Sequence, residues 1–148
     1  MHRKVAAALV AALALVGAGC GSSETLTRAE LVRRIETACR QGQAQVQAST
    51  RARGGSQSAQ QVRFVTALRD SQQSFVDTLD DLEPPDAAKS DFEAFKQSIE
   101  ARAELIDDVA SAGAGKIDQA MRSVQREATV ASQRAEQSAR ALGVDGCF

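Results

Sequence analysis

The stretch Leu26-Thr27-Arg28-Ala29-Glu30-Leu31 decides the fold class, because it is the clearest helix start in the chain. A threonine followed three residues later by a glutamate forms a capping box, in which the two side chains bond backbone amides that the first helical turn leaves without partners. The leucines on either side of the box are placed to contact each other as a hydrophobic staple. The stretch therefore predicts a helix from Thr27 onward.

Apolar and small residues continue from this start at spacings of three and four, the pattern of a helix with one buried face. The stripe contains Leu31, Ile35, Ala38, Cys39, Gly42 and Val46. Glu30 precedes Arg34, and Glu36 precedes Arg40, by four residues, which predicts ion pairs on a solvated face. The stretch 51–58 (RARGGSQS) is rich in glycine and serine and predicts a loop.

Turn-forming residues divide the rest of the chain into three more helical segments. A second capping-box pattern, residues 58–61, starts the first of them, and Pro84 and Pro85 end it because neither donates a backbone hydrogen bond. The next segment begins near Asp86 and stops at 113–115 (GAG), and the last ends before Gly143, a residue suited to a left-handed helix cap. The three apolar stripes are Val65, Leu68, Gln72, Phe75, Leu79 and Leu82; Phe92, Phe95, Ile99, Ala103, Ile106 and Val109; and Ile117, Met121, Val124, Ala128, Ala131, Ala135 and Leu142.

Four amphipathic helices joined by short breaks can bury all their stripes against each other. We therefore predict an all-α fold, an up-down-up-down four-helix bundle over residues 27–148. Helices of about 20 to 26 residues would be about 30 to 40 Å long at about 1.5 Å per residue. A longer, looser antiparallel coiled coil is the alternative, because the last stripe is rich in alanine.

The first 19 residues have the features of an export signal. Arg3 and Lys4 precede an apolar run of twelve residues, 5–16. That run is too short to span a bilayer, which needs about 20 residues. Small residues then lead to Cys20, and we predict cleavage before this cysteine.

The junction LVGAGC, residues 15–20, followed by GSS, residues 21–23, resembles the lipobox of bacterial lipoproteins. The resemblance implies that Cys20 becomes the acylated N-terminus of the mature protein and that residues 20–26 form a lipidated tether. The domain would then be anchored at the extracytoplasmic face of the cell membrane. The pattern usually has a large aliphatic residue where this chain has Gly17, and plain secretion is the alternative.

Cysteine parity favours lipidation. Three cysteines in an exported chain leave one without a partner, and a thioether to lipid at Cys20 leaves Cys39 and Cys147 as a pair. In the predicted bundle the last helix ends at the pole where the first begins, so the C-terminal tail can fold back along the first helix. We expect a Cys39–Cys147 disulfide.

Three short motifs resemble a group of small, uncharacterised actinobacterial helical lipoproteins. They are LTRAE at 26–30 running to Cys39, LEPP at 82–85, and ALGVDGC at 141–147. The resemblance implies the same helical architecture and the same pair of cysteines. It implies no activity.

Residue types that most catalytic sites need are missing from the mature chain. The single histidine, His2, leaves with the signal, so no imidazole base, histidine metal ligand or common catalytic triad remains. Cys39 and Cys147 are too far apart in sequence for a C-x₂-C metal or redox motif, and the segment 113–116 (GAGK) lacks the rest of a phosphate loop. We predict no enzymatic activity, no cofactor and no metal site.

Charge and aromatic content argue against a nucleic-acid partner. Removing Arg3 and Lys4 from 18 basic residues leaves 16 against 19 acids, a mature net charge of −3. The chain has no tryptophan or tyrosine on which bases could stack. The membrane, through lipid on Cys20, is the partner that the sequence predicts most directly.

Two groups of side chains leave a binding function open. The acids Asp77, Asp80, Asp81, Glu83 and Asp86 lie around one corner of the bundle, where they are either solvated, with Lys89 sharing the charge, or hold calcium. The phenylalanines Phe64, Phe75, Phe92 and Phe95 are expected in the core, and alternatively line an apolar pocket. Met121 is expected in the core rather than as a haem ligand.

Together these patterns favour a membrane-anchored extracytoplasmic lipoprotein. Its helical domain would be non-enzymatic and would present a face to an envelope protein or a cell-wall component. The alternative is an envelope bundle that carries a small apolar molecule or a cation.

Overall fold

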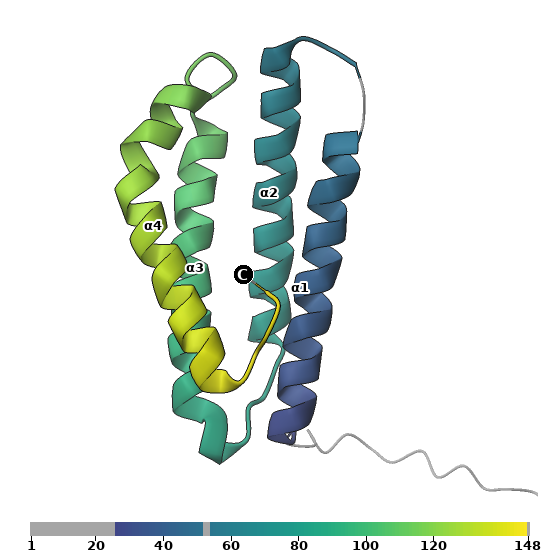
Figure 1. Cartoon of the computed structure of the whole chain (residues 1–148), viewed down its shortest axis with the longest axis vertical. Helices are drawn as coiled ribbons and strands as arrows, with labels where there is room; N and C mark the ends of the chain where they lie inside the picture. Colours follow the sequence, from purple (N-terminus) through teal and green to yellow (C-terminus); the bar gives the residue numbers. More distant parts are fainter. Residues whose placement is uncertain (1–25, 52–53, 148) are drawn as a thin grey trace, which may run out of the picture.

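The computed structural model describes residues 26–51 and 54–147. Within these ranges all regular structure is helical: α1 (Arg28–Arg51), α2 (Gln57–Asp80), the 3₁₀ turn η1 (Asp86–Ala88), α3 (Lys89–Ser111) and α4 (Ile117–Leu142). The four long helices run alternately up and down, with α1 packed on α2, α2 on α3 and α3 on α4 (Figure 1). The predicted all-α four-helix bundle is confirmed, in preference to the looser coiled coil. The signal, Cys20 and the start of the tether lie outside the described residues.

The capping box at the start of α1 forms as predicted. The Thr27 hydroxyl and backbone N–H donate to Glu30 Oε2 at 2.6 and 2.9 Å, and the Glu30 N–H donates back to Thr27 Oγ1 at 3.3 Å. Leu26 and Leu31 are both buried in one cluster, as the staple requires. The Glu36–Arg40 ion pair is present at 3.8 Å, whereas the predicted pair of Glu30 with Arg34 is not seen, because the Glu30 carboxylate bonds Thr27 instead.

Helix α2 begins and ends earlier than the sequence pattern indicated. Its N-cap is Ser56, whose Oγ accepts from the Ala59 N–H at 3.2 Å, so the predicted cap at Ser58 was wrong. Gly54 and Gly55 have positive φ and turn the chain immediately before Ser56, which brings the cap forward. At the other end Asp80 is the last helical residue, and Leu82 follows the helix although its side chain is buried.

A Schellman motif ends α4 at the predicted glycine. Gly143 has φ +88°, and its N–H donates to the Arg140 carbonyl at 3.1 Å and to that of Ala139 at 2.9 Å. The Val144 N–H also donates to the Ala139 carbonyl, at 2.9 Å. These bonds satisfy carbonyls that the last turn would leave unpaired, and the left-handed residue turns the chain off the helix axis.

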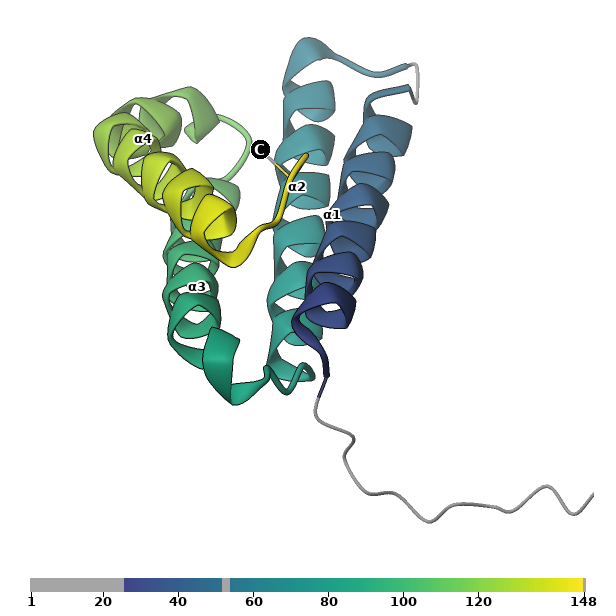
Figure 2. The same ribbon diagram turned by 60° about the horizontal axis from the view of Figure 1, so that its bottom comes forward.

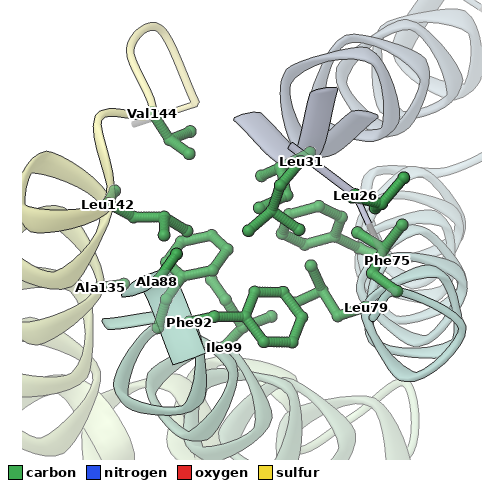
Figure 3. Close-up of a cluster of buried hydrophobic side chains, with 14 residues drawn as sticks. Leu26, Leu31, Phe75, Leu79, Ala88, Phe92, Ile99, Ala135, Leu142 and Val144 are labelled. Atoms are coloured by element: carbon green, nitrogen blue, oxygen red, sulfur yellow. The ribbon is translucent and has the colours of Figure 1, made fainter. Parts of the chain in front are cut away.

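The main core gathers residues near the start of α1 and the end of α4. Figure 3 shows its side chains in close-up. All four helices contribute to it, and Val144 of the tail closes one side. Its buried members are Leu26, Leu31, Ile35, Phe75, Leu79, Leu82, Ala88, Phe92, Phe95, Ile99, Ala135, Ala139, Leu142 and Val144. At about 25 cal/mol per Å² of apolar surface, these side chains supply most of the driving force for folding.

A second, smaller cluster lies near the opposite pole. It consists of Val65 from α2, Val109 from α3 and Ile117 from α4, with partly buried neighbours that include Val124. Between the two clusters α4 presents short side chains, among them Ala128 and Ser132. Short side chains reach less far toward α2 than those of either cluster, so the packing is thinner at this level.

The C-terminal tail crosses from α4 to the α1–α2 pair (Figures 1 and 2). Cys147 is joined to Cys39 by a disulfide with a Cα–Cα distance of 5.6 Å, as predicted. At the same pole the Arg28 guanidinium donates to the carbonyls of Ala141 at 2.7 Å and Leu142 at 3.3 Å. The tail and Arg28 therefore link α4 to α1, two helices that do not pack closely along their length.

None of the helices in the described ranges combines the length and the hydropathy needed to cross a membrane.

Candidate functional site

The four phenylalanines do not form the pocket that was considered as an alternative. Phe75, Phe92 and Phe95 are buried in the main core, and the rings of Phe75 and Phe95 pack edge to face with centroids 6.2 Å apart. Phe64 lies elsewhere on α2, with 39% of its surface exposed. Three of the four are therefore buried core residues, as expected, whereas Phe64 is exposed and lines a hollow between α2, α3 and α4.

The acidic corner at the end of α2 is not arranged as a metal site. Asp80 forms an ion pair with Lys96 Nζ at 2.5 Å, so the neighbouring lysine is Lys96 rather than the expected Lys89. This hydrogen bond with Asp80 is the main reason why the pKa of Lys96 is raised above its ordinary value. Across the described residues, no group of three or more His, Cys, Asp or Glu side chains is placed to hold a metal ion.

Met121 is not a core residue, contrary to the prediction. It lies in the first turns of α4, and 48% of its surface is exposed. Together with Phe64 it is one of the large apolar side chains that remain exposed in the described part of the chain. An exposed pair of this kind is more informative than a buried one, because large apolar surface left in water often marks a binding site.

Phe64 and Met121 stand in the same groove. The groove has a volume of about 540 Å³ and is lined by α2, α3 and α4. Its apolar lining consists of Phe64, Val65, Leu68, Leu105, Ile106, Val109, Met121, Val124 and Ala128. Its polar lining, all from α4, consists of Gln125, Thr129, Ser132, Gln133 and Glu136. We call this site the α2–α4 groove.

The groove follows from the sequence of α4. Near the upper pole Gln61 of α2 donates a hydrogen bond to Asp118 of α4, and the smaller cluster fills the space beneath. Farther along, the residues of α4 that face α2 are Ala128 and Ser132, which are too short to close the gap. The two helices are thus held together at the upper end, and the space along α4 below it is left open.

The groove changes in character along its length. At the upper end all three helices contribute apolar side chains, including Val65, Val109 and Met121. Toward the lower end only α4 lines it, with Ser132, Gln133 and then Glu136. One Glu136 oxygen accepts a hydrogen bond from Arg140 at 3.0 Å. The site is therefore apolar at one end and hydrogen-bonding at the other.

Two other hollows differ in chemistry. A depression of about 770 Å³ between α3 and another face of α4 is lined by several alanines and two serines, and by charged side chains that include Glu104, Arg126 and Arg134. A smaller hollow of about 280 Å³ lies beside the disulfide. It contains Arg102, whose pKa is lowered by burial, and the buried Gln72 Oε1, which has no hydrogen-bond partner among the described residues.

The lining of the α2–α4 groove is mostly apolar, with five polar side chains, all from α4. Glu136 is its single ionisable lining residue, and this carboxylate accepts a hydrogen bond from Arg140. A mostly apolar concavity of a few hundred Å³ with a few polar groups is typical of a ligand site. No protein-family model, curated protein or solved structure matches the chain.

Sequence reasoning missed this groove. It assigned Met121, Val124 and Ala128 to a buried stripe, and the spacing of three and four is indeed present. The usable signal was the size of the side chains: Ala128, Ala131 and Ala135 follow one another at three- and four-residue steps, and such short residues fill little of a four-helix interior.

Proposed function

We propose that the chain is a membrane-anchored extracytoplasmic lipoprotein whose helical domain is a non-enzymatic binding module. In this proposal Cys20 carries the lipid and residues 20–26 tether the bundle to the outer face of the cell membrane. The α2–α4 groove is the binding surface, and its first candidate partner is an envelope protein or a cell-wall component.

The observation that supports this proposal is the exposure of two large apolar side chains, Phe64 and Met121, in one groove. Exposing two large apolar side chains costs stability that a purely structural domain could recover by burying them. A binding role explains why they stand together. The disulfide adds to the argument, because disulfides persist in oxidising compartments outside the cytoplasm.

Mass spectrometry of the membrane-extracted protein tests the anchor. We expect the mature chain to begin at Cys20 and to carry the mass of two or three acyl chains. A Cys20→Ala variant should lose the acyl mass and leave the membrane fraction. A mature chain that begins elsewhere, or that carries no lipid, contradicts the proposed location.

A pull-down from solubilised membranes tests the binding surface. We expect Phe64→Gln and Met121→Gln to lose the partner that the unchanged protein retains. Val130→Gln is the matched control, because Val130 is also exposed on α4, at 41%, but lines the depression on its other face. Equal loss in the control and the groove variants would show that the groove is not the binding surface.

The second candidate function is a carrier of a small apolar molecule. It is favoured by the volume of the groove, about 540 Å³, which is within the range of known small-molecule sites. It predicts a bound ligand that copurifies with the protein and is released by organic extraction. The partner would then be a compound rather than a macromolecule.

A further inference from the structure

We propose that the α2–α4 groove binds a single-chain amphiphile. Its apolar tail would lie at the upper end, among Phe64, Val109 and Met121. Its head group, neutral or cationic and able to donate hydrogen bonds, would lie at the lower end beside Glu136. The inference rests on the second candidate function above, a carrier of a small apolar molecule, and names the class of ligand.

The upper end of the groove suits an alkyl tail. Three helices converge there, and Val65, Ile106 and Val124 supply aliphatic surface. Val65 is 4% exposed, so the floor is part of the packed interior, whereas Phe64 and Met121 stand partly in water at the sides. An apolar chain in this position would cover the exposed parts of both side chains and gain the hydrophobic stabilisation that they now lack.

The lower end suits a head group with N–H or O–H donors. Glu136 presents a carboxylate, and one of its oxygens is held by Arg140 at 3.0 Å. A carboxylate only accepts hydrogen bonds when ionised, so a donating head group can bond it, whereas an ionised carboxylate head group has no hydrogen to donate to it. Ser132 and Gln133 stand one turn before Glu136 and can bond either a donor or an acceptor.

The length of the groove favours a narrow ligand over a helix of a partner protein. Along α4 it extends from Met121 to Glu136, fifteen steps or about 22 Å at 1.5 Å each. On α2 it extends only from Phe64 to Leu68, about 6 Å. A docked helix about 10 Å across needs apolar contacts along both walls for several turns. A single chain needs two apolar walls only at its tail, which is the arrangement observed.

Photolabelling of the full chain in membranes tests the proposal. The probes are three alkyl diazirines of one chain length, each with an alkyne handle, that end in a primary amine, an alcohol or a carboxylate. After irradiation, the labelled residues are mapped by peptide mass spectrometry. We expect label within 64–68, 105–109 and 121–136, the segments that line the groove. Label confined to other segments would overturn the proposal.

Filling the groove should remove the label. Ala128→Phe places a ring in the groove and should reduce labelling about tenfold, the effect of losing about 1.4 kcal/mol of binding. Ala101→Phe is the matched control, because Ala101 lines the α3–α4 depression instead. Thermal unfolding of both variants checks that they fold. If Ala128→Phe does not fold, Met121→Gln replaces it, because this substitution is at an exposed position and should also reduce labelling. Equal labelling of the groove and control variants would refute the proposal.

The head-group preference has its own test. The unchanged protein should be labelled more by the amine than by the carboxylate, and Glu136→Gln should lower this ratio about fivefold, as expected for one exposed charge pair. Comparing the two proteins in the same membranes cancels differences in how the probes partition. A ratio that does not change would show that Glu136 does not contact the head group and would overturn the orientation proposed.

These outcomes can be separated from those of the proposed function. A chain with acylated Cys20 whose groove takes up no probe would leave the lipoprotein proposal in place and refute the ligand class. A chain that is labelled in the groove but carries no lipid at Cys20 would refute the lipoprotein proposal and leave the ligand class in place.

Discussion

At the scale of single residues, Thr27 and Glu30 illustrate how one pair of side chains starts a helix. The three hydrogen bonds between them satisfy the first free amides of α1. The bond from the Thr27 hydroxyl, followed by that from its N–H, lowers the pKa of the Glu30 carboxyl below its ordinary value. The carboxylate is therefore the form that the folded protein prefers.

We predict a pH-dependent contribution from Glu30. Because its pKa is lower in the folded chain than in the unfolded one, the contribution is fully present above the unfolded pKa. It is lost as the pH falls through the folded pKa. NMR titration of the side chain should show the lowered pKa, and Thr27→Ala should raise it toward the ordinary value. An unchanged pKa in Thr27→Ala would contradict the assigned cause.

The two glycines at the ends of α4 should respond differently to alanine. Gly143 has φ +88°, which disfavours any side chain, and we expect Gly143→Ala to lower the free energy of unfolding by about 1 to 2 kcal/mol. Gly115 has no positive φ, and no atom lies within 4 Å of an added Cβ, so Gly115→Ala should be neutral or slightly stabilising. Urea unfolding of both variants measures this. Equal effects would show that backbone conformation is not the cause.

At the scale of helices, α1 and α2 approach closely because α1 has a glycine at the contact. A Cβ added to Gly42 would lie 2.6 Å from Ser71 Oγ, which is too close for an unstrained contact. Ser71 is only 5% exposed, so its hydroxyl has little room to move. The same glycine costs helix propensity, so the close packing is gained at the expense of local stability.

This contact predicts a coupled pair of substitutions. Gly42→Ala alone should destabilise the protein by about 1 to 3 kcal/mol through overpacking. With Ser71→Ala as well, the nearest Ser71 atom is its Cβ at 3.9 Å, an ordinary contact, and the loss should largely disappear. A double-mutant cycle in urea gives the coupling energy. Gly42→Ala being stabilising by itself would show that the hydroxyl moves aside freely.

The short side chains of helix α4 have different effects on its two inward faces. Ala131, Ala135 and Ala139 are buried, and such short side chains allow it to lie close against α3. On the side that faces α2, Ala128 and Ser132 leave the groove open. Larger side chains there would have extended the core and removed the only proposed binding surface.

At the scale of the whole molecule, the Cys39–Cys147 disulfide spans 108 positions and fixes the tail across the open side of the bundle. Val144, three residues before Cys147, is 3% exposed and belongs to the main core. The covalent link thus helps to keep a short irregular segment in place as part of the hydrophobic interior.

Removing both cysteines should therefore destabilise the whole domain. We expect Cys39→Ser with Cys147→Ser to lower the free energy of unfolding by about 2 to 5 kcal/mol, because the loop that the disulfide closes is long. Reduction of the unchanged protein with a dithiol should give the same value, which controls for the serines. Urea denaturation provides the measurement, and a loss below about 0.5 kcal/mol would contradict this role.

Local patterns predicted most of the helices because their causes are local. The box at Thr27, the prolines at 84 and 85 and the glycine at 143 act through their own backbone neighbours. The start of α2 was misplaced by two residues because two nearby serines can both cap a helix, and the sharp turn at the preceding glycines selected Ser56.

The sequence by itself determined four amphipathic helices and their order, because spacing, caps and chain direction are properties of neighbouring residues. The pairing of Cys39 with Cys147, 108 positions apart, followed only once these helices were placed antiparallel in a bundle. Only the tertiary structure decided that Met121 and Phe64 share a groove, that Lys96 pairs with Asp80, and that Arg28 bonds the end of α4. Each of these depends on the distance between helices, which is set by how completely side chains from distant parts of the chain fill the space between them.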